Sequence, residues 1–128
     1  AFFASLTGEK RSQQLGQLRK VLRRAAEDER LKGLYLNLRG VVADFTTMQE
    51  LRRSLVAFKK SGKPIFVNMD SASNLDYFLA SAGTRINLSP LGGMNIPGPM
   101  MSLSYFGPAL KKLGLEMEVF RAGKYKSH

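Results

Sequence analysis

The sequence predicts a single α/β domain, and two observations support this prediction. Short apolar runs alternate along the chain with segments in which apolar residues recur at helical spacing, which is the order of strands and helices in an α/β fold. The chain has 128 residues and is 44% apolar, enough to bury one compact core. We therefore expect one α/β domain spanning residues 1–128.

The first expected element is an amphipathic helix from Ser12 to about Arg30. Its leucine, valine and alanine residues recur on one side of the helix and leave arginines on the opposite side. Residues 34–38, Leu-Tyr-Leu-Asn-Leu, follow Gly33 and are typical of a buried strand. Residues 39–45 are expected to form the loop after that strand.

A second helix is predicted to begin at a capping box, because Thr47 and Glu50 have the required spacing. Apolar residues then repeat on one face until Gly62 and Pro64 end the helix. Residues 65–69 form the next apolar run and are a predicted strand. Strand, helix and strand together make a βαβ unit, which favours parallel pairing of the two strands.

Shorter elements are expected in the second half of the chain. Residues 70–74 can cap a short helix that runs to Ala82, and Gly83 is predicted to end it in a left-handed conformation. Residues 85–88 are a predicted strand. The stretch at 92–99 holds too many glycines and prolines for a regular element and is interpreted as a loop or an irregular strand.

The last expected elements are a helix over residues 105–113 and a strand over residues 115–120, separated by Gly114. The repeated βα units predict a mostly parallel sheet. After the last strand the chain ends in Arg121-Ala-Gly-Lys-Tyr-Lys-Ser-His128.

The chain is strongly basic, with a formal net charge of +10 from 20 basic and 10 acidic residues. Many basic residues lie in the first third, where a helix face rich in arginine and lysine would attract polyanions. Nucleic acid and anionic lipid headgroups are both candidates, and a solvated helix face is the plain alternative. With no cysteine and one histidine, a metal site is not expected. The loop at 92–98 lacks the glycine-rich patterns that bind phosphate, so a nucleotide is not expected either, and no cofactor is predicted.

No stretch approaches the ~20 apolar residues that a membrane-spanning helix needs, and Ala1-Phe-Phe-Ala4 is too short for an intact signal sequence. We expect this chain to be a segment of a longer protein.

Four segments resemble the signal peptide peptidase A (SppA) family in their order and spacing. They are Gly33-Leu-Tyr-Leu-Asn-Leu-Arg-Gly40, Ser61-Gly-Lys-Pro-Ile-Phe-Val67, Tyr77-Phe-Leu-Ala-Ser-Ala-Gly-Thr-Arg-Ile-Asn-Leu-Ser-Pro90 and Val119-Phe-Arg-Ala-Gly-Lys-Tyr-Lys-Ser127. The members of that family are membrane-bound serine-lysine peptidases built on the ClpP/crotonase fold. The resemblance therefore implies a ClpP/crotonase-like fold and a peptidase activity.

The resemblance assigns the catalytic base to Lys126. In the longer, two-repeat members of the family, the amino-terminal repeat carries the lysine base and the carboxy-terminal repeat carries the serine nucleophile. Lys126 stands where the family motif has that lysine, and the Tyr-Lys-Ser order favours it over Lys124. The chain is thus expected to be the amino-terminal, lysine-donating repeat, with the serine in the missing carboxy-terminal repeat.

The nucleophile that the family pattern requires is absent from its position. The family has Ser-Gly-Gly at the start of the helix after the 65–69 strand, whereas this chain has Asn74-Leu-Asp76. A carboxamide cannot attack a peptide carbonyl, so this repeat alone is not expected to cleave, although a register shift of one residue would place Ser73 there. The family's Pro-Gly-Gly, whose N–H groups help to form the oxyanion hole, is replaced by Arg39-Gly40-Val41.

The resemblance implies a membrane-associated endopeptidase on the periplasmic or equivalent lumenal side that degrades cleaved signal peptides and other apolar peptides. Its implied partners are the missing repeat, further copies in a homo-oligomer and, through the basic first helix, an anionic membrane surface.

Two other functions stay open, a non-catalytic ClpP/crotonase-like assembly module and a basic nucleic-acid-binding domain. The second lacks any recognised motif, so no nucleic-acid partner is expected. The apolar cluster of Met94, Met100, Met101, Leu103 and Phe106 could line a substrate groove or a subunit interface, or belong partly to the core.

Overall fold

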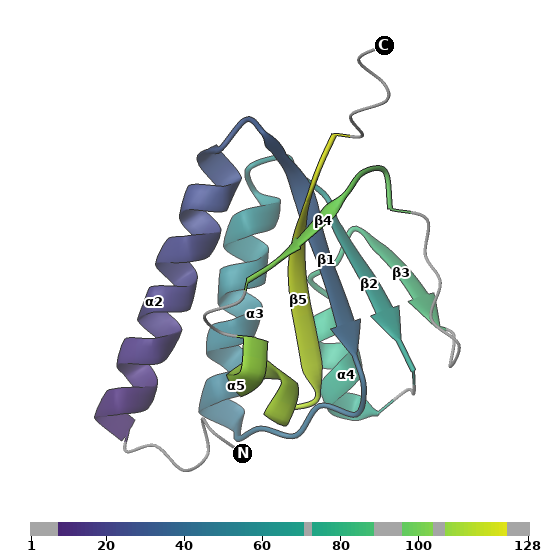
Figure 1. Cartoon of the computed structure of the whole chain (residues 1–128). Coiled ribbons are helices and arrows are strands. Elements are labelled where there is room, and N and C mark those ends of the chain that lie inside the picture. The colour runs from purple at the N-terminus through teal and green to yellow at the C-terminus, as the bar shows by residue number, and fades with distance from the viewer. Residues whose placement is uncertain (1–7, 71–72, 89–95, 104–106, 123–128) are drawn as a thin grey trace.

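In the computed structural model of this chain, residues 8–70, 73–88, 96–103 and 107–122 are described, and they form one five-stranded sheet and four helices (Figure 1). In chain order the elements are α2 (Gly8–Glu27), β1 (Leu31–Leu38), α3 (Phe45–Lys59), β2 (Ile65–Met69), α4 (Asn74–Ala80), β3 (Arg85–Leu88), β4 (Met100–Ser102), α5 (Gly107–Lys112) and β5 (Leu115–Arg121). These bounds confirm the predicted alternation, and each strand predicted from an apolar run is present.

The sheet has the strand order β3-β2-β1-β5-β4. β1, β2 and β3 run parallel, which confirms the predicted βαβ unit. β5 lies on the other side of β1 and runs antiparallel to it, and β4 is antiparallel to β5. Parallel pairing therefore holds for the first three strands, and the last strand of the described chain lies inside the sheet beside the first.

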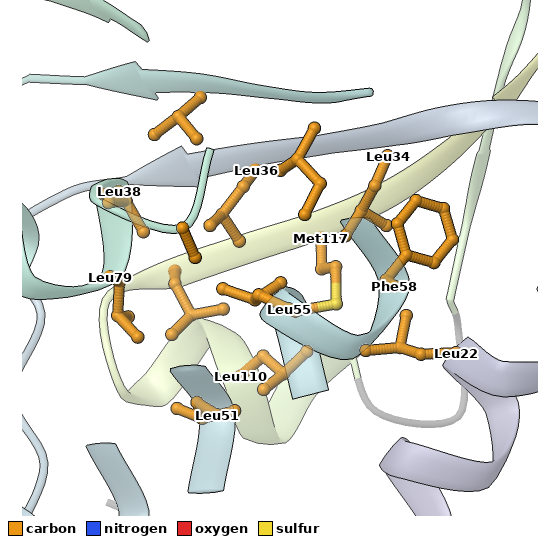
Figure 2. Close-up of a cluster of buried hydrophobic side chains, with 14 of the residues drawn as sticks. Leu22, Leu34, Leu36, Leu38, Leu51, Leu55, Phe58, Leu79, Leu110 and Met117 are labelled. Carbon is orange, nitrogen blue, oxygen red and sulfur yellow. The ribbon is translucent and has the colours of Figure 1, made fainter. Parts of the chain in front are cut away.

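The core lies between one face of the sheet and the helices. Because side chains alternate along a strand, Leu34, Leu36 and Leu38 of β1 all point toward the helices, and Figure 2 shows them above the side chains of α3. Full burial of one leucine side chain contributes about 1.5–3 kcal/mol. Further members of this core are Leu18 and Leu22 of α2, Leu51, Leu55 and Phe58 of α3, Leu79 of α4, Leu110 of α5 and Met117 of β5.

Helix α3 begins earlier than the predicted capping box. Asp44 is the N-cap, and its side chain accepts a hydrogen bond from Thr47 N–H at 3.1 Å. The capping box of Thr47 and Glu50 is therefore wrong. Thr47 is buried against the core, and Glu50 accepts a hydrogen bond from Arg19 of α2 at 3.4 Å.

Two of the predicted glycine stops are confirmed, because Gly62 and Gly114 have φ angles of 92° and 89°. The third is wrong: Gly83 has no positive φ, and α4 ends at Ala80 with a right-handed C-cap. Gly83 is instead packed too closely for a side chain, since an added Cβ would lie 2.6 Å from Cγ2 of Val67. Close packing against β2, and not the end of a helix, requires a glycine at this position.

Strand β4 has no counterpart among the elements predicted from the sequence. Residues 92–95 of the expected loop lie outside the described residues, and residues 96–99 have no regular structure. β4 follows them as a three-residue strand with Met100 opposite Phe120. The predicted helix over 105–113 corresponds to α5, and its first two residues lie outside the described part of the chain.

Candidate functional site

A buried carboxylate lies at the carboxyl end of β1. Asp76, in the first turn of α4, is 0% exposed and accepts hydrogen bonds from Val41 N–H at 2.7 Å and from Gly40 N–H at 3.2 Å. Gly40 has a φ of 74°, a left-handed conformation of the kind that lets successive N–H groups converge on one anion. These two charge-assisted hydrogen bonds compensate for the cost of burying the carboxylate.

The same loop is held from the other side by the turn between α5 and β5. Arg39 N–H donates to the Gly114 carbonyl at 2.7 Å, and Val42 N–H donates to the Leu113 carbonyl at 2.8 Å. Gly114 approaches the loop so closely that an added Cβ would lie 2.7 Å from the Gly40 carbonyl oxygen. The four consecutive N–H groups of residues 39–42 therefore all have partners in this structure.

The two candidate nucleophile positions lie at the start of α4. Asn74, where the family pattern has serine, is the first residue of the helix and is exposed. Ser73 is the N-cap, and its hydroxyl oxygen accepts a hydrogen bond from Asp76 N–H at 3.1 Å. The Ser73 hydroxyl therefore caps the amino-terminal end of α4. Ser71 lies outside the described residues.

Residues 123–128, which include the predicted base Lys126, lie outside the described residues, and the last described residue is Ala122. Because β5 is antiparallel to β1, Arg121 lies opposite Leu31 at the amino end of β1. Ser73, by contrast, follows β2 and lies past the carboxyl ends of β1 and β2. The structure therefore does not bring the end of β5 together with the start of α4.

A row of three asparagines crosses the face of the sheet that points away from the helices. Asn87 Nδ2 donates to Asn68 Oδ1 at 2.8 Å, and Asn68 Nδ2 donates to Asn37 Oδ1 at 3.2 Å. Asn37 Nδ2 donates in turn to Glu116 of β5 at 3.2 Å. Asn68 is 0% exposed and Asn37 is 7% exposed, so most of this row is a buried polar network that links four strands.

Charged residues surround the Glu116 end of the asparagine row. The Arg39 guanidinium lies 3.7 Å from the Glu116 carboxylate and 3.8 Å from the Asp70 carboxylate. Burial raises the pKa of Tyr35, and the nearby carboxylates of Glu118 and Glu116 raise it further. The Tyr35 phenol therefore stays protonated at neutral pH and offers no general base there.

The basic face of α2 consists of Arg19, Lys20, Arg23 and Arg24, which are all exposed. Arg19 pairs with Glu50 of α3 at 3.4 Å. Four cations within six residues of one helix give this surface a concentrated positive charge.

Two grooves flank α2, and neither is lined by Asp76 or by its partners Gly40 and Val41. One of about 170 Å³ lies between α2 and α3, and one of about 220 Å³ lies between α2 and the β4 and β5 side of the sheet. Met101 and Leu103, two members of the predicted apolar cluster, line the second groove, and Leu103 also packs against the core. Met100 and Met101 are 44% and 46% exposed, whereas Met94 and Phe106 lie outside the described residues.

Within the described residues, no three His, Cys, Asp or Glu side chains come together in a way that could hold a metal ion. No helix in the same part of the chain is long and apolar enough to cross a membrane.

The sequence matches the model of peptidase family S49 over residues 57–128. The chain belongs to peptidase family S49. This membership confirms the resemblance to the SppA family, and the mixed α/β sheet of the S49 chain fits the ClpP/crotonase-like fold of that family.

Three relatives of this S49 chain carry the names of proteases. Protease 4 of Salmonella typhi is 36% identical over 107 residues, which cover 83% of this chain and 17% of the relative. Protease 4 of Haemophilus influenzae is 34% identical over 107 residues, with the same shares of 83% and 17%. The chloroplastic serine protease SPPA of Arabidopsis thaliana is 33% identical over 113 residues, or 88% of this chain and 17% of the relative. The S49 chain thus spans about a sixth of the length of these relatives.

Sequence reasoning misses the role of Asp76 in the S49 chain. Ser73 and Asp76 have the spacing of an N-cap and the third helical residue, which signals a helix start. The carboxylate does not reach back to the N-cap, however, and instead binds Gly40 and Val41, which are 36 and 35 residues away. Only the adjacency of β1 and β2 brings these groups together.

Proposed function

We propose that this chain is the amino-terminal, lysine-donating repeat of a two-repeat S49 peptidase, in which Lys126 is the general base and the serine nucleophile lies outside the chain. The direction of β5 is the observation that supports this most. β5 leaves the sheet at the amino end of β1, whereas Ser73 and Asn74 lie beyond the carboxyl end.

The length of β1 sets the distance that a base in this chain would have to bridge to reach its own Ser73. β1 has eight residues, which at ~3.3 Å per residue span about 23 Å. Lys126 follows Ala122 by four residues, and four residues cover at most about 14 Å when fully extended. These lengths favour a serine from another repeat or subunit as the partner of Lys126.

The start of α4 also supports a non-cleaving role for this repeat. Asn74 has no nucleophilic oxygen, and the Ser73 hydroxyl caps the helix. A peptidase must also offer free N–H donors to the developing oxyanion. In this chain the N–H groups of Gly40 and Val41 are bound to Asp76.

The chemistry proposed for Lys126 needs a neutral amine. The reference pKa of a lysine is roughly 10.4, so the amine is charged at neutral pH unless its surroundings change. Burial against the second repeat would disfavour the ammonium form and lower the pKa. The neutral amine then takes the proton of the serine hydroxyl, whose oxygen attacks the scissile carbonyl carbon, and returns a proton to the leaving amine.

The proposed substrates are cleaved signal peptides and other apolar peptides. The whole protein is proposed to be a membrane-associated homo-oligomer on the periplasmic or equivalent lumenal side. The basic face of α2 supports contact with an anionic membrane surface. Binding to lipid vesicles should then increase with the share of anionic lipid and disappear at high salt. Binding that is absent, or that ignores salt, contradicts the membrane proposal.

The test of the catalytic proposal is a peptidase assay on the full-length protein that contains this chain, with an apolar fluorogenic peptide. Lys126→Ala should lower kcat/KM by about 10²–10⁴-fold, the usual contribution of a general base. Lys124→Ala is the matched control, because it removes the same side chain two residues earlier, and it should retain activity. The wild-type rate should rise with pH as the amine loses its proton.

Two outcomes would contradict the proposal. If Lys126→Ala keeps wild-type activity, the base assignment is wrong and the chain is the non-catalytic assembly module. That role also fits the absence of a nucleophile at Asn74 and the binding of the Gly40 and Val41 N–H groups by Asp76. If the 128-residue chain cleaves peptides alone, a nucleophile within it, such as Ser73, must be responsible.

A further inference from the structure

We propose that the turn formed by Gly40 and Val41 is an anion-binding site that this chain fills with its own Asp76 carboxylate. The proposal goes beyond the proposed function, since it does not depend on which residue acts as the base. The chemical class of ligand is a small carboxylate, of which the Asp76 side chain is the resident example.

The contacts of Asp76 are those of a bound anion. Both of its carboxylate oxygens accept a backbone hydrogen bond, Oδ1 from Val41 at 2.7 Å and Oδ2 from Gly40 at 3.2 Å. The residue is 0% exposed, and among the described residues no lysine or arginine forms an ion pair with it. Within the described part of the chain, backbone N–H groups and not an opposite charge therefore compensate the buried carboxylate.

The two donors are aimed by contacts that do not involve Asp76. The preceding and following N–H groups, of Arg39 and Val42, are bound to the carbonyls of Gly114 and Leu113 at 2.7 and 2.8 Å. These bonds fix the loop on both sides of the anion site. Removal of the carboxylate alone should therefore leave the turn in place, with the buried Val41 N–H and the partly buried Gly40 N–H both without a partner, at a considerable cost in stability.

A free carboxylate can replace the side chain that is removed. Formate is a carboxylate, the same group that Asp76→Ala removes, and it is small enough for the space that the substitution opens. Binding to the folded state stabilises it by RT ln(1 + c/Kd), where c is the formate concentration, so the melting temperature keeps rising with the logarithm of that concentration above the Kd. Formate at ten times its Kd should raise the melting temperature of this variant by roughly 3–6 °C.

The controls separate this site from general salt effects. Chloride at equal ionic strength should give no comparable rise in Asp76→Ala. Asp44→Ala is the matched variant, because Asp44 also accepts a backbone N–H bond, from Thr47 at 3.1 Å, but is exposed. Because Asp44 is exposed, water can take the place of its carboxylate at the Thr47 N–H once the side chain is removed. Formate should therefore stabilise Asp44→Ala no more than chloride does, and the same holds for the wild type. In Asp76→Ala the amide NMR signals of Gly40 and Val41 should shift with formate at the same Kd.

Two further measurements keep the proposal testable if Asp76→Ala does not fold in plain buffer. The readout then becomes folding itself, followed by circular dichroism, which formate should restore and chloride should not. Asp76→Asn keeps the shape but turns a donor toward one of the two N–H groups, so it should melt well below the wild type. A formate effect no larger than that of chloride, or wild-type stability in Asp76→Asn, would overturn the proposal.

Discussion

Replacing Asn68 by leucine tests whether the asparagine row holds the sheet together. Asn68 is 0% exposed and stands in the middle of the row, donating to Asn37 at 3.2 Å and accepting from Asn87 at 2.8 Å. Leucine has a similar size but offers neither a donor nor an acceptor. Asn37 Oδ1 then loses its donor, and Asn87 Nδ2 loses its acceptor.

The magnitude follows from the burial of the two partners. Asn37 is 7% exposed, so its unpaired oxygen costs about 1–3 kcal/mol. Asn87 is only partly buried, so water can replace the lost contact and the net cost is about 0.5–1.5 kcal/mol. Asn68→Leu should therefore lower the free energy of unfolding by roughly 1.5–4.5 kcal/mol, and the burial of the apolar leucine side chain should offset part of that loss.

A double-mutant cycle removes that uncertainty, because the gain from added apolar surface cancels between the single and double variants. The cycle on Asn37 and Asn68, measured by equilibrium unfolding in urea, should give a coupling of about 0.5–1.5 kcal/mol. Asn37 and Asn87 share no hydrogen bond, so their cycle is the control and should stay within about 0.5 kcal/mol of additivity. Equal couplings in the two cycles would refute the idea that contacts within the row carry the effect.

Further predictions concern the core, the glycines and acid stability. Phe58→Ala should cost about 3–5 kcal/mol in urea unfolding, because the ring is 2% exposed within the core; a loss below about 1 kcal/mol would contradict that packing. Gly114→Ala should lower the melting temperature, since it forces a φ of 89° on alanine, whereas Gly16→Ala should raise it, since the added methyl group meets nothing within 4 Å in a helix. Hydrogen bonds from the side chain and backbone of Arg30 lower the pKa of Asp28 from 3.8 to about 2. That stabilisation is complete above about pH 4 and is lost as the pH falls toward 2, so melts across this range should show a steeper loss in the wild type than in Asp28→Asn.

The helices and strands were predictable because their signals are local. The apolar spacing within α3 and the apolar runs of β1 and β2 each lie within a few residues of sequence. Helix caps are less certain for a physical reason: Asp44 and Thr47 are both good N-caps, and the backbone of the preceding loop decides between them. Gly83 is similar, since sequence cannot distinguish a glycine needed for its φ angle from one needed for close packing.

The candidate site was predictable only in part. The family pattern located the start of α4 and the loop after β1 as the place to look, and the structure brings these two segments together through Asp76. The contact itself joins residues 35 and 36 positions apart, and no local spacing encodes it. The antiparallel position of β5 was likewise hidden, because an apolar alternation fixes which side chains face the core and not which strand is the neighbour.

The place of β5 in the sheet also constrains the order in which the protein can fold during its synthesis. β1 is synthesised early, but its second neighbour in the sheet is β5, and Leu38 of β1 pairs with Leu115 of β5. This pairing must therefore wait until almost the whole described chain has left the ribosome. Until then one edge of β1 is open, with its unpaired N–H and C=O groups beside an apolar row. The nascent chain is therefore most exposed to wrong strand pairing after β2 has formed and before β5 arrives. Closing a contact over so long a loop is also slow, so insertion of β5 should limit the folding rate.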